Sequence, residues 1–585
     1  MTDPAAFIRN KIMAVALLLA LCFGLYFWRL GNLPFQTRGE PREALVVWEM
    51  VRTGNWILPL INDDYIPYKP PLFHWFGVLT SEIYGDVNEL TVRLPSALFA
   101  TLGVLLIYLA AARFWNAKAG LVAASALATR PEWWNSATET QVDMTLAFFI
   151  TAALLLFYMM YKEEHYGVGW SSALAALVAL ATLAKGPIGC VVPTLAIIVF
   201  LGARRDFAPL KKVHFLSALF VFIVIAGSWY AGALWQGGWA FFKRQILEEN
   251  LGTAEGTYGH HQSYGYFFPI FLLNLAPWSL FLPAIGYFVY SRRRTLSADH
   301  LLFPIIWLVT VFVVCTLSSG KRGVYILPLY PAAALLIGAW WSNVEKGDVH
   351  AQWLTSATAF WMAVLTLFAI GLFVLMVKGE GQFFIPLPKK LGVVTELLQS
   401  SFPLARAGVW TSLGLMGAGA ALILGSVLRK NWNGLLVALT LIATTVIVFL
   451  KLALYPAVAA KHTLKPFVNR LPQKVAPETP LLFYRSFDYG TVFYSRRHIP
   501  NYADRVNDLS GPFYLLMWEE DWRRLSKANH LKMLDISEGG GPTGRHRLVL
   551  VEPVAGPASP KKNLPLIDPQ GYSGINTRPT DSVSD

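Results

Sequence analysis

The feature that most constrains this sequence is a set of long apolar runs without a charged residue. Ile12 to Trp28, Phe215 to Tyr230 and Leu354 to Val377 are such runs, of roughly 16 to 24 residues, near the length of a helix that crosses a bilayer. In the whole chain 55% of residues are hydrophobic and 15% are charged, against about a quarter charged in soluble domains. The sequence therefore predicts a polytopic α-helical membrane protein.

Apolar runs alternate with charged breaks and predict about thirteen transmembrane helices, a number that puts the termini on opposite sides of the membrane. The expected starts lie near residues 12, 94, 119, 143, 170, 188, 213, 266, 301, 325, 354, 405 and 433.

Lysine and arginine accumulate in one set of alternate breaks, and short cytoplasmic loops are typically enriched in these residues. The set contains Arg9 and Lys11; Arg113 and Lys118; Lys162; Arg204, Arg205, Lys211 and Lys212; Arg292 to Arg294; Lys346; and Arg429 and Lys430. We therefore expect a protein of the bacterial inner membrane with a cytoplasmic N-terminus. The net charge is +13, and many of the lysine and arginine residues lie beside the predicted spans. There they are expected to orient the helices in the membrane or to bind phosphate, so no nucleic-acid partner is expected.

The segments predicted outside the cytoplasm are 31–93, 130–142, 236–265, 378–404 and the chain after Tyr455. Within 31–93, apolar and charged residues alternate at helical spacing from Glu40 to Thr53, which predicts an amphipathic helix. Pro70 to Tyr84 predicts a second helix. Both helices are expected to lie in the membrane interface. The expected domains are a transmembrane domain at 1–455, a small periplasmic α/β or α+β domain at 456–556, and a disordered tail at 557–585.

Four short stretches after Tyr455 have the composition of β-strands. They are Pro480 to Tyr484, Thr491 to Tyr494, Pro512 to Trp518 and His546 to Val551.

Ionisable residues collect on the predicted external side, and polar residues at membrane depth are costly enough to suggest function. Such a set suits glycosyl transfer from a lipid phosphate: cations stabilise the phosphate that leaves, and a carboxylate accepts the proton of the acceptor hydroxyl. The candidates are Glu40 and Asp143 as catalytic carboxylates, and Arg42, Lys69, Lys185, His260, His261, Lys321, Arg322 and Tyr325 as substrate-binding residues.

Several candidates also have purely structural interpretations. Glu40 and Asp143 could stabilise helix N-termini, and Lys185 could extend from a span end toward water. The adjacent His260 and His261 could be ordinary loop residues.

Six short motifs, in order between residue 12 and about 330, resemble the family of membrane glycosyltransferases that includes the aminoarabinose transferase of lipid A and the protein O-mannosyltransferases. They are Gly39-Glu40-Pro41-Arg42-Glu43, Gly54-Asn55-Trp56-Ile57-Leu58-Pro59, Tyr68-Lys69-Pro70-Pro71, Arg93-Leu94-Pro95-Ser96, Lys185-Gly186-Pro187, and Lys321 with Tyr325 and Pro328.

The resemblance implies a GT-C fold and an inverting transfer from a polyprenyl-phosphate sugar, such as an undecaprenyl-phosphate sugar. The acceptor would be lipid A or another glycolipid, a polysaccharide or a protein. Two positions depart from the family: Gly39 stands at its leading Asp, and Tyr68 at a Glu that helps to hold a divalent cation in the aminoarabinose branch. The cofactor is therefore left open, with a divalent cation in doubt.

Two other functions fit many spans with charged residues. A transporter or flippase of lipid-linked sugars should carry its ionisable residues near the middle of spans, whereas here they lie at span ends. A non-catalytic assembly subunit is the second alternative, because two family residues are replaced.

Overall fold

The computed structural model describes residues 4–63, 65–252, 262–296, 300–378, 403–505, 512–529, 531–541, 544 and 546–553. The chain forms two compact units. Unit 1 comprises Met1–Trp28, Leu94–Tyr230 and Gln262–Tyr455, and unit 2 comprises Arg29–Arg93, Ala231–His261 and Pro456–Asp585. Unit 1 thus ends at Tyr455, where the composition of the sequence changes.

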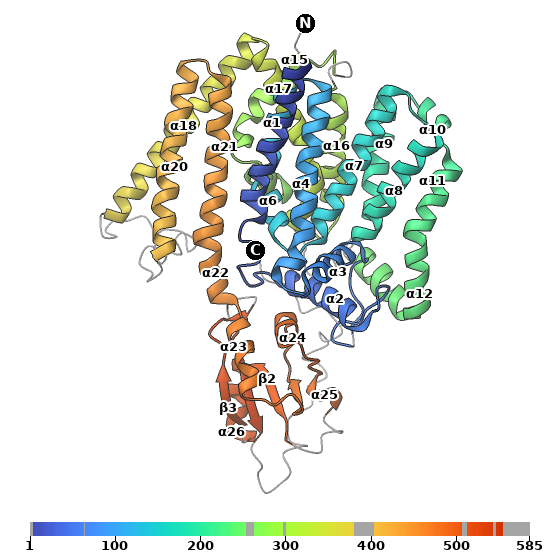
Figure 1. Ribbon diagram of the computed structural model, residues 1–585, viewed down its shortest axis with the longest axis vertical. Helices are drawn as coiled ribbons and strands as arrows, with labels where there is room; N and C mark the ends of the chain where they lie inside the picture. Colours follow the sequence, from blue (N-terminus) through green and yellow to red (C-terminus); the bar gives the residue numbers. More distant parts are fainter. Residues whose placement is uncertain are drawn as a thin grey trace. The chain divides into compact units, whose positions relative to one another are not determined.

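Unit 1 is a bundle of apolar helices (Figure 1). Its main helices are α1 (Pro4–Cys22), α4 (Glu89–Phe114), α5 (Ala117–Ala128), α6 (Pro131–Thr138), α7 (Val142–Glu163), α8 (Val168–Lys185), α9 (Ile188–Arg204), α10 (Ala208–Lys212), α11 (Phe215–Phe222), α14 (Phe267–Asn274), α15 (Leu282–Ser291), α16 (Leu302–Leu317), α17 (Tyr330–Glu345), α18 (Val349–Lys378), α20 (Pro403–Leu428) and α21 (Trp432–Phe449). Three helices contain residues of both units: α4, whose residues 89–93 belong to unit 2, α12 (Ser228–Phe241) and α22 (Tyr455–His462).

Among the described residues, eight helices are long and apolar enough to cross a membrane, or nine if the bent pair Phe267–Asn274 and Trp278–Ser291 is one span. Four shorter apolar helices, Lys11–Phe27, Ala117–Ala128, Ile188–Arg204 and Leu302–Leu317, account for the remaining expected starts. The chain is therefore a multi-span helical membrane protein, as the sequence predicted, while the number of spans stays a prediction.

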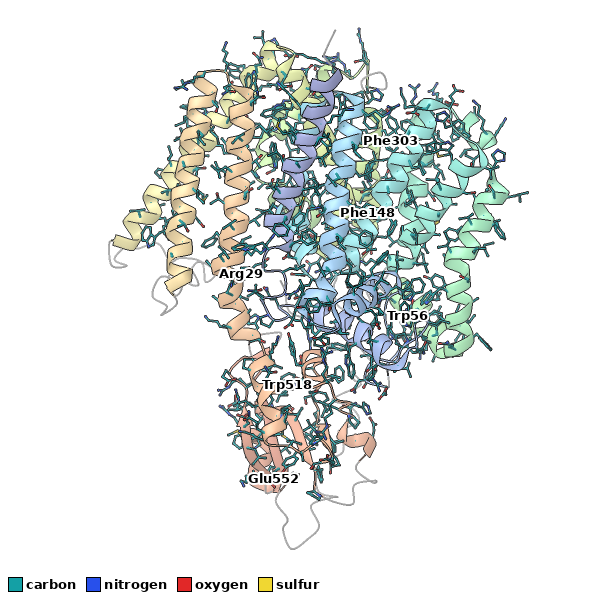
Figure 2. All side chains as sticks on the ribbon, in the orientation of Figure 1. Arg29, Trp56, Phe148, Phe303, Trp518 and Glu552 are labelled. Atoms are coloured by element: carbon teal, nitrogen blue, oxygen red, sulfur yellow. The ribbon has the colours of Figure 1, made fainter. Side chains whose placement is uncertain are left out.

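Aromatic side chains fill much of the interior of unit 1. Phe303 of α16 stacks on Tyr158 of α7, with ring centroids 4.5 Å apart, and Phe148 of α7 packs against Phe99 of α4 at 5.2 Å. Figure 2 labels Phe303 and Phe148 among the side chains of this bundle. These contacts fix how α4, α7 and α16 pack against one another.

Polar contacts bring several loops rich in lysine and arginine to one end of unit 1. Arg113 at the end of α4 pairs with Glu163 at the end of α7, and Lys118 at the start of α5 pairs with Glu345 at the end of α17. Similar contacts join Lys212 to Glu164 and Arg292 to Asn343. These loops belong to the set assigned to the cytoplasm from sequence, and the orientation itself stays a prediction.

Unit 2 contains the two helices expected between residues 31 and 93, as α2 (Gly39–Thr53) and α3 (Leu72–Tyr84). They pack closely: a Cβ atom at Gly77 would lie 2.7 Å from Val47 Cγ2. The carboxylates of α2 are buried rather than turned to water, which differs from the simple amphipathic pattern. Each has a cation or an imidazole beside it: Arg93 for Glu40, Arg42 and His74 for Glu43, and Arg52 for Glu49.

Unit 2 also contains a sheet of four strands in the order β1-β2-β4-β3. Strand β1 (Leu481–Phe483) is parallel to β2 (Tyr514–Trp518), and β4 (Leu548–Pro553) is antiparallel to both β2 and β3 (Leu531–Ile536). The short helices are α23 (Lys465–Arg470), α24 (Tyr489–Ser495), α25 (Tyr502–Arg505) and α26 (Glu519–Asn529). Figure 2 labels Trp518 at the end of β2 and Glu552 on β4.

One expected strand is wrong, since Thr491 to Tyr494 lies in helix α24. Asp488 precedes this helix, and its side chain accepts hydrogen bonds from the backbone N–H of Thr491 (2.6 Å) and from the Thr491 hydroxyl (2.9 Å). An aspartate that accepts from the first turn is a strong helix start, and here it outweighs the β-propensity of the sequence that follows.

Candidate functional site

In unit 1 the candidate residues Asp143 and Lys185 form an ion pair. Asp143 lies in the first turn of α7, and Lys185 is the last residue of α8. Lys185 Nζ donates to Asp143 Oδ1, and it also lies 4.2 Å from the ring centroid of Tyr325. The side chains of Asp143 and Lys185 are 13% and 12% exposed. The pair is thus mostly buried, with a small part of each side chain exposed, and we call it, with Tyr325, the Asp143 cluster.

The Lys-Gly-Pro motif places Lys185 at this point. Gly186 has φ +93° and ψ −160°, a conformation open essentially only to glycine. At Gly189 a Cβ atom would lie 2.2 Å from the backbone of Ala181, so the start of α9 packs directly on α8. The motif therefore ends α8 abruptly and leaves Lys185 beside Asp143.

Lys321 and Arg322 differ in their surroundings. Lys321 is buried, and its Nζ donates to the carbonyl oxygens of Ser318 at 2.6 Å and Gln262 at 3.2 Å. It therefore ties its own loop together, which is a structural role that the sequence did not indicate. Arg322 is exposed, and the 3-10 helix Gly323–Leu329 that follows carries Tyr325.

In unit 2 Lys69 is held by a carboxylate. Lys69 Nζ pairs with Glu249 in the π-helical segment Phe242–Gly252. The side-chain amide of Gln245, in the same segment, donates to the carbonyl oxygen of Pro67 at 3.0 Å. The loop that carries Lys69 is therefore fastened to this segment at two points.

Two guanidinium groups lie against the ring of Tyr68, next to Lys69. The distances from Cζ to the ring centroid are 5.1 Å for Arg42 and 4.2 Å for Arg244, which is cation–π range. Arg244 also pairs with Glu248 at 2.9 Å. Lys69, Arg42 and Arg244, which we call the basic cluster with Tyr68, bring three cations together, and each of them has a carboxylate partner.

The surroundings of Tyr68 do not fit a divalent cation. Such an ion requires carboxylate or carbonyl oxygens as ligands, whereas position 68 offers an aromatic ring next to two guanidinium groups. Within the described ranges no group of three His, Cys, Asp or Glu side chains is arranged to hold a metal ion.

Glu43 is the carboxylate that keeps Arg42 in place. Arg42 approaches Glu43 Oε1 to 2.7 Å, and His74 Nε2 lies 2.8 Å from Glu43 Oε2. Burial alone would raise the pKa of Glu43, but the charge of Arg42 and the hydrogen bond from His74 lower this pKa from 4.5 to about 2. Glu43 is therefore a charged anchor rather than a proton acceptor near neutral pH.

Glu40 lies in a different kind of environment from Asp143. It is 0% exposed and accepts two hydrogen bonds from Arg93, at 2.8 and 3.2 Å, and one from the backbone N–H of Gln36 at 2.9 Å. Arg93 is itself buried and also donates to the carbonyl oxygens of Leu30 and Leu33. This network joins residues 30–40 to position 93, so the geometry favours a structural role for Glu40.

Arg244 and Glu249 are members of the candidate site that the sequence did not predict, and Arg93 was predicted only as part of a motif. Arg244 carried a usable signal, because it lies in a predicted external segment where the positive-inside rule expects few cations. Glu249 had none, since its partner Lys69 is distant in sequence. His260 and His261 lie outside the described residues.

Comparisons with known proteins point to one family. The family of dolichyl-phosphate-mannose-protein mannosyltransferases matches residues 68–230. An uncharacterized protein of Aquifex aeolicus is 32% identical over 53% of this chain and 70% of its own length. The undecaprenyl phosphate-alpha-4-amino-4-deoxy-L-arabinose arabinosyl transferase of Yersinia pestis is 27% identical over 56% of this chain, and the match covers 59% of that enzyme.

The fold is also that of a solved structure, ArnT from Cupriavidus metallidurans bound to undecaprenyl phosphate. The TM-score is 0.76 at 22% sequence identity, over 95% of this chain and 99% of the other. Fold, motifs and relatives define a membrane glycosyltransferase. The chain belongs to the GT-C family of membrane glycosyltransferases.

Proposed function

We propose that this protein transfers a sugar from a polyprenyl-phosphate carrier, such as undecaprenyl phosphate, to an acceptor on the periplasmic side of the inner membrane. The observation that carries the proposal is the Asp143 cluster, a partly exposed carboxylate paired with a lysine. The name of the Yersinia pestis relative and the ligand of the ArnT structure support a polyprenyl-phosphate donor.

Asp143 is the better candidate for the base toward the acceptor hydroxyl. A general base must reach the proton that it removes, and Asp143 is partly exposed whereas Glu40 is enclosed by Arg93. Lys185 holds the side chain of Asp143 in place through their ion pair. Because the attacking hydroxyl and the leaving phosphate are on opposite sides of the sugar carbon in a single displacement, an inverting transfer follows.

The basic cluster of unit 2 has the chemistry to bind the phosphate of the donor. When the bond between the sugar and the phosphate breaks, negative charge develops on the phosphate oxygens, and fixed cations stabilise it. Arginine can bind phosphate through two parallel hydrogen bonds, whereas lysine contributes a point charge. Lys69 becomes available to the phosphate once Glu249 releases it.

The transfer is proposed to need no divalent cation at position 68. Arg42 and Arg244 bring two positive charges to that position, and the charge of a metal ion there would repel both.

The decisive experiment compares Asp143→Asn, Glu40→Gln and a control, Asp206→Asn. Asp206 is partly exposed in a loop of unit 1 and contacts the Tyr161 hydroxyl at 3.1 Å. In an assay with the purified chain, a polyprenyl-phosphate sugar and an acceptor, Asp143→Asn should lower turnover by about 10²- to 10⁴-fold. Binding of polyprenyl phosphate and the activity of Asp206→Asn should be unchanged. Near wild-type turnover of Asp143→Asn would refute its assignment as base.

The acceptor is proposed to be lipid A or another glycolipid, with a polysaccharide or a protein as alternatives. Glycolipid profiles of cells with and without the gene test this directly. A glycolipid that loses one sugar in the deletion strain, and regains it with the wild-type chain but not with Asp143→Asn, identifies the acceptor. Unchanged glycolipids together with an altered glycoprotein or polysaccharide would redirect the assignment.

A further inference from the structure

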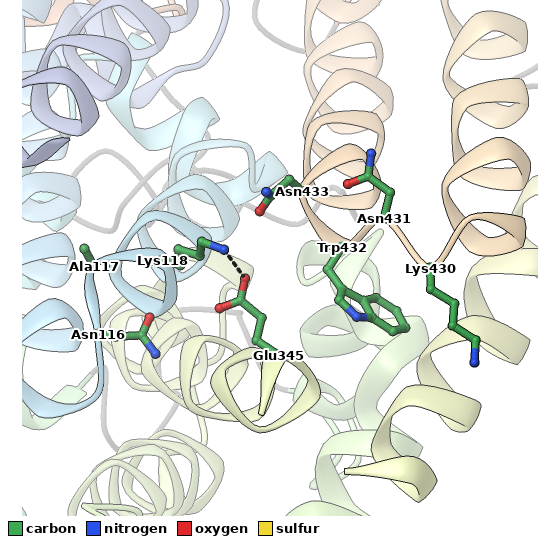
Figure 3. Close-up of a pocket in the computed structure, with 8 residues that line it drawn as sticks. All are labelled: Asn116, Ala117, Lys118, Glu345, Lys430, Asn431, Trp432 and Asn433. Atoms are coloured by element: carbon green, nitrogen blue, oxygen red, sulfur yellow. Dashed lines mark ion pairs between the residues drawn. The ribbon is translucent and has the colours of Figure 1, made fainter. Parts of the chain in front are cut away.

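A cavity of about 610 Å³ lies in unit 1 between the start of α5, the end of α17 and the turn between α20 and α21 (Figure 3). Its charged side chains do not converge on one ligand. Lys118 points to Glu345, with Nζ and Oε1 3.2 Å apart, and the side chain of Lys430 points away from this pair. In unit 2, by contrast, side chains from separate segments of the chain meet at the basic cluster.

The sheet and short helices of unit 2 share a hydrophobic core with α2 and α3. Leu45 of α2 lies in the same buried cluster as Val492 of α24 and Leu516 of β2. Asn62, in the loop after α2, donates to the carbonyl oxygen of Ile499 at 3.1 Å and accepts from the N–H of Ile499 at 3.0 Å. The C-terminal part of the chain therefore packs firmly on the helices that carry the basic cluster.

Three aromatic rings lead from α24 to the loop that carries Lys69. The ring centroid of Tyr489, the first residue of α24, lies 4.9 Å from that of Phe487, which in turn lies 5.7 Å from that of Tyr65. Tyr65 is three residues before Tyr68 in the same loop. Both ring contacts are edge to face, a favourable arrangement for aromatic pairs. Tyr489 is thus held beside the basic cluster.

The hydroxyl of Tyr489 meets the polar groups of the cluster. It forms a hydrogen bond with the hydroxyl of Tyr68 and lies close enough to Arg42 and Arg244 to interact with both guanidinium charges. Burial and the neighbouring Tyr68 raise the pKa of Tyr489 above its usual value. The phenol therefore keeps its proton near neutral pH and remains a hydrogen-bond donor.

A neutral donor complements the three cations of the cluster. A phosphate has to draw each cation partly away from its carboxylate partner, whereas a phenol turns its proton to an anion by rotating one C–O bond. When Tyr68 donates to Tyr489, the proton of Tyr489 is left for a further acceptor.

We propose that Tyr489 is a donor-binding residue, whose hydroxyl donates a hydrogen bond to the phosphate that the basic cluster binds. This inference rests on the proposed function, since it assigns a further residue to the same donor site. It gives the C-terminal part of unit 2 a direct share in substrate binding. Asp488, which caps α24, holds the first turn of that helix in place.

The test measures how the purified full chain binds undecaprenyl phosphate and, separately, undecaprenol, which has the same chain without the phosphate. Tyr489→Phe removes the hydroxyl and keeps the ring that packs on Phe487. The matched control is Tyr494→Phe in the same helix. The Tyr494 hydroxyl donates to Glu89 and accepts from the backbone N–H of Phe35, both at 3.1 Å.

Tyr489→Phe should bind undecaprenyl phosphate about ten-fold more weakly than wild type, because a hydrogen bond to a charged group is lost, while Tyr494→Phe binds it like wild type. All three should bind undecaprenol equally. If wild type prefers the phosphate over the alcohol and Tyr489→Phe does so equally, this inference is overturned and the donor proposal stands. If wild type has no such preference, both are overturned.

A second comparison separates a direct contact from an effect through Tyr68. In a chain that already carries Tyr68→Phe, adding Tyr489→Phe should still weaken binding of undecaprenyl phosphate by about the same factor. No further loss in that background would make Tyr489 a positioning residue for Tyr68 and would refute the direct contact.

Discussion

Replacing Glu40 by Gln tests whether this residue is part of the framework or part of the chemistry. The substitution keeps the shape of the side chain and removes the charge that faces Arg93, a guanidinium that is 2% exposed. Removing one partner of a buried ion pair typically costs about 3–5 kcal/mol, because the other charge is left uncompensated. Since Gln still accepts a hydrogen bond, we expect the lower end, about 3 kcal/mol, or roughly a hundred-fold in the folding equilibrium.

The assay is unfolding of the purified chain in detergent, followed by heat and by denaturant. Glu40→Gln together with Arg93→Met removes both charges and should be less destabilising than Glu40→Gln alone. Glu519→Gln in α26 is the matched control, because its partners Arg523 and Arg547 are both exposed, at 67% and 44%, and such pairs contribute only about 0–1 kcal/mol. If Glu40→Gln unfolds like wild type but turns over about 10²- to 10⁴-fold more slowly, the base is Glu40 and the structural interpretation is refuted.

Three further predictions concern unit 2. The pKa of Glu43 is lowered from 4.5 to about 2 in the folded chain, so its contribution, about 3 kcal/mol, should be complete above about pH 4.5 and disappear as the pH falls toward 2. Unfolding of wild type and Glu43→Gln between pH 6 and 3 measures this, and a constant difference between them would contradict it. A chelator of divalent cations should leave turnover unchanged, and restoration of lost activity by one particular cation would disprove the metal-independent proposal. Asp488→Ala removes the cap of α24 and should lower stability by about 1 kcal/mol, whereas Asp488→Asn, which can still accept from the Thr491 N–H, should lower it less.

The elements that the sequence predicted well are those with a strong local signal. The amphipathic spacing of Glu40 to Thr53 and the prolines before Leu72 were enough to place α2 and α3. Thr491 to Tyr494 forms a helix although its β-branched and aromatic residues predict a strand, because Asp488, three residues before Thr491, caps the helix. Strand β3 was missed because its apolar residues are interrupted by Lys532 and Asp535 and gain their partners only in the sheet.

The candidate site was predictable in its residue types and less so in its pairings. Asp143 and Lys185 were both proposed separately, but nothing local in the sequence indicates that the end of α8 returns to the start of α7. Glu40 was given a catalytic role because its neighbours match a family motif. Its partner Arg93 lies in another motif, 53 residues away, and only the fold reveals that the two neutralise each other.

Each unit holds one candidate lysine against a carboxylate, Lys185 with Asp143 and Lys69 with Glu249. A lone ammonium group in a poorly solvated place is costly, and a paired carboxylate offsets much of that cost. An anionic donor therefore has to compete with Glu249 for Lys69, and part of its binding energy goes into this exchange.

Glu249→Gln removes the competitor, so we expect tighter binding of polyprenyl phosphate by about ten-fold. Lys69→Ala should weaken the same binding by about as much or more, since a charge-assisted hydrogen bond to phosphate contributes about 1.5–3 kcal/mol. Titration of both variants with polyprenyl phosphate measures the two effects, and weaker binding by Glu249→Gln would mean that Glu249 positions Lys69 for the phosphate instead of withholding it.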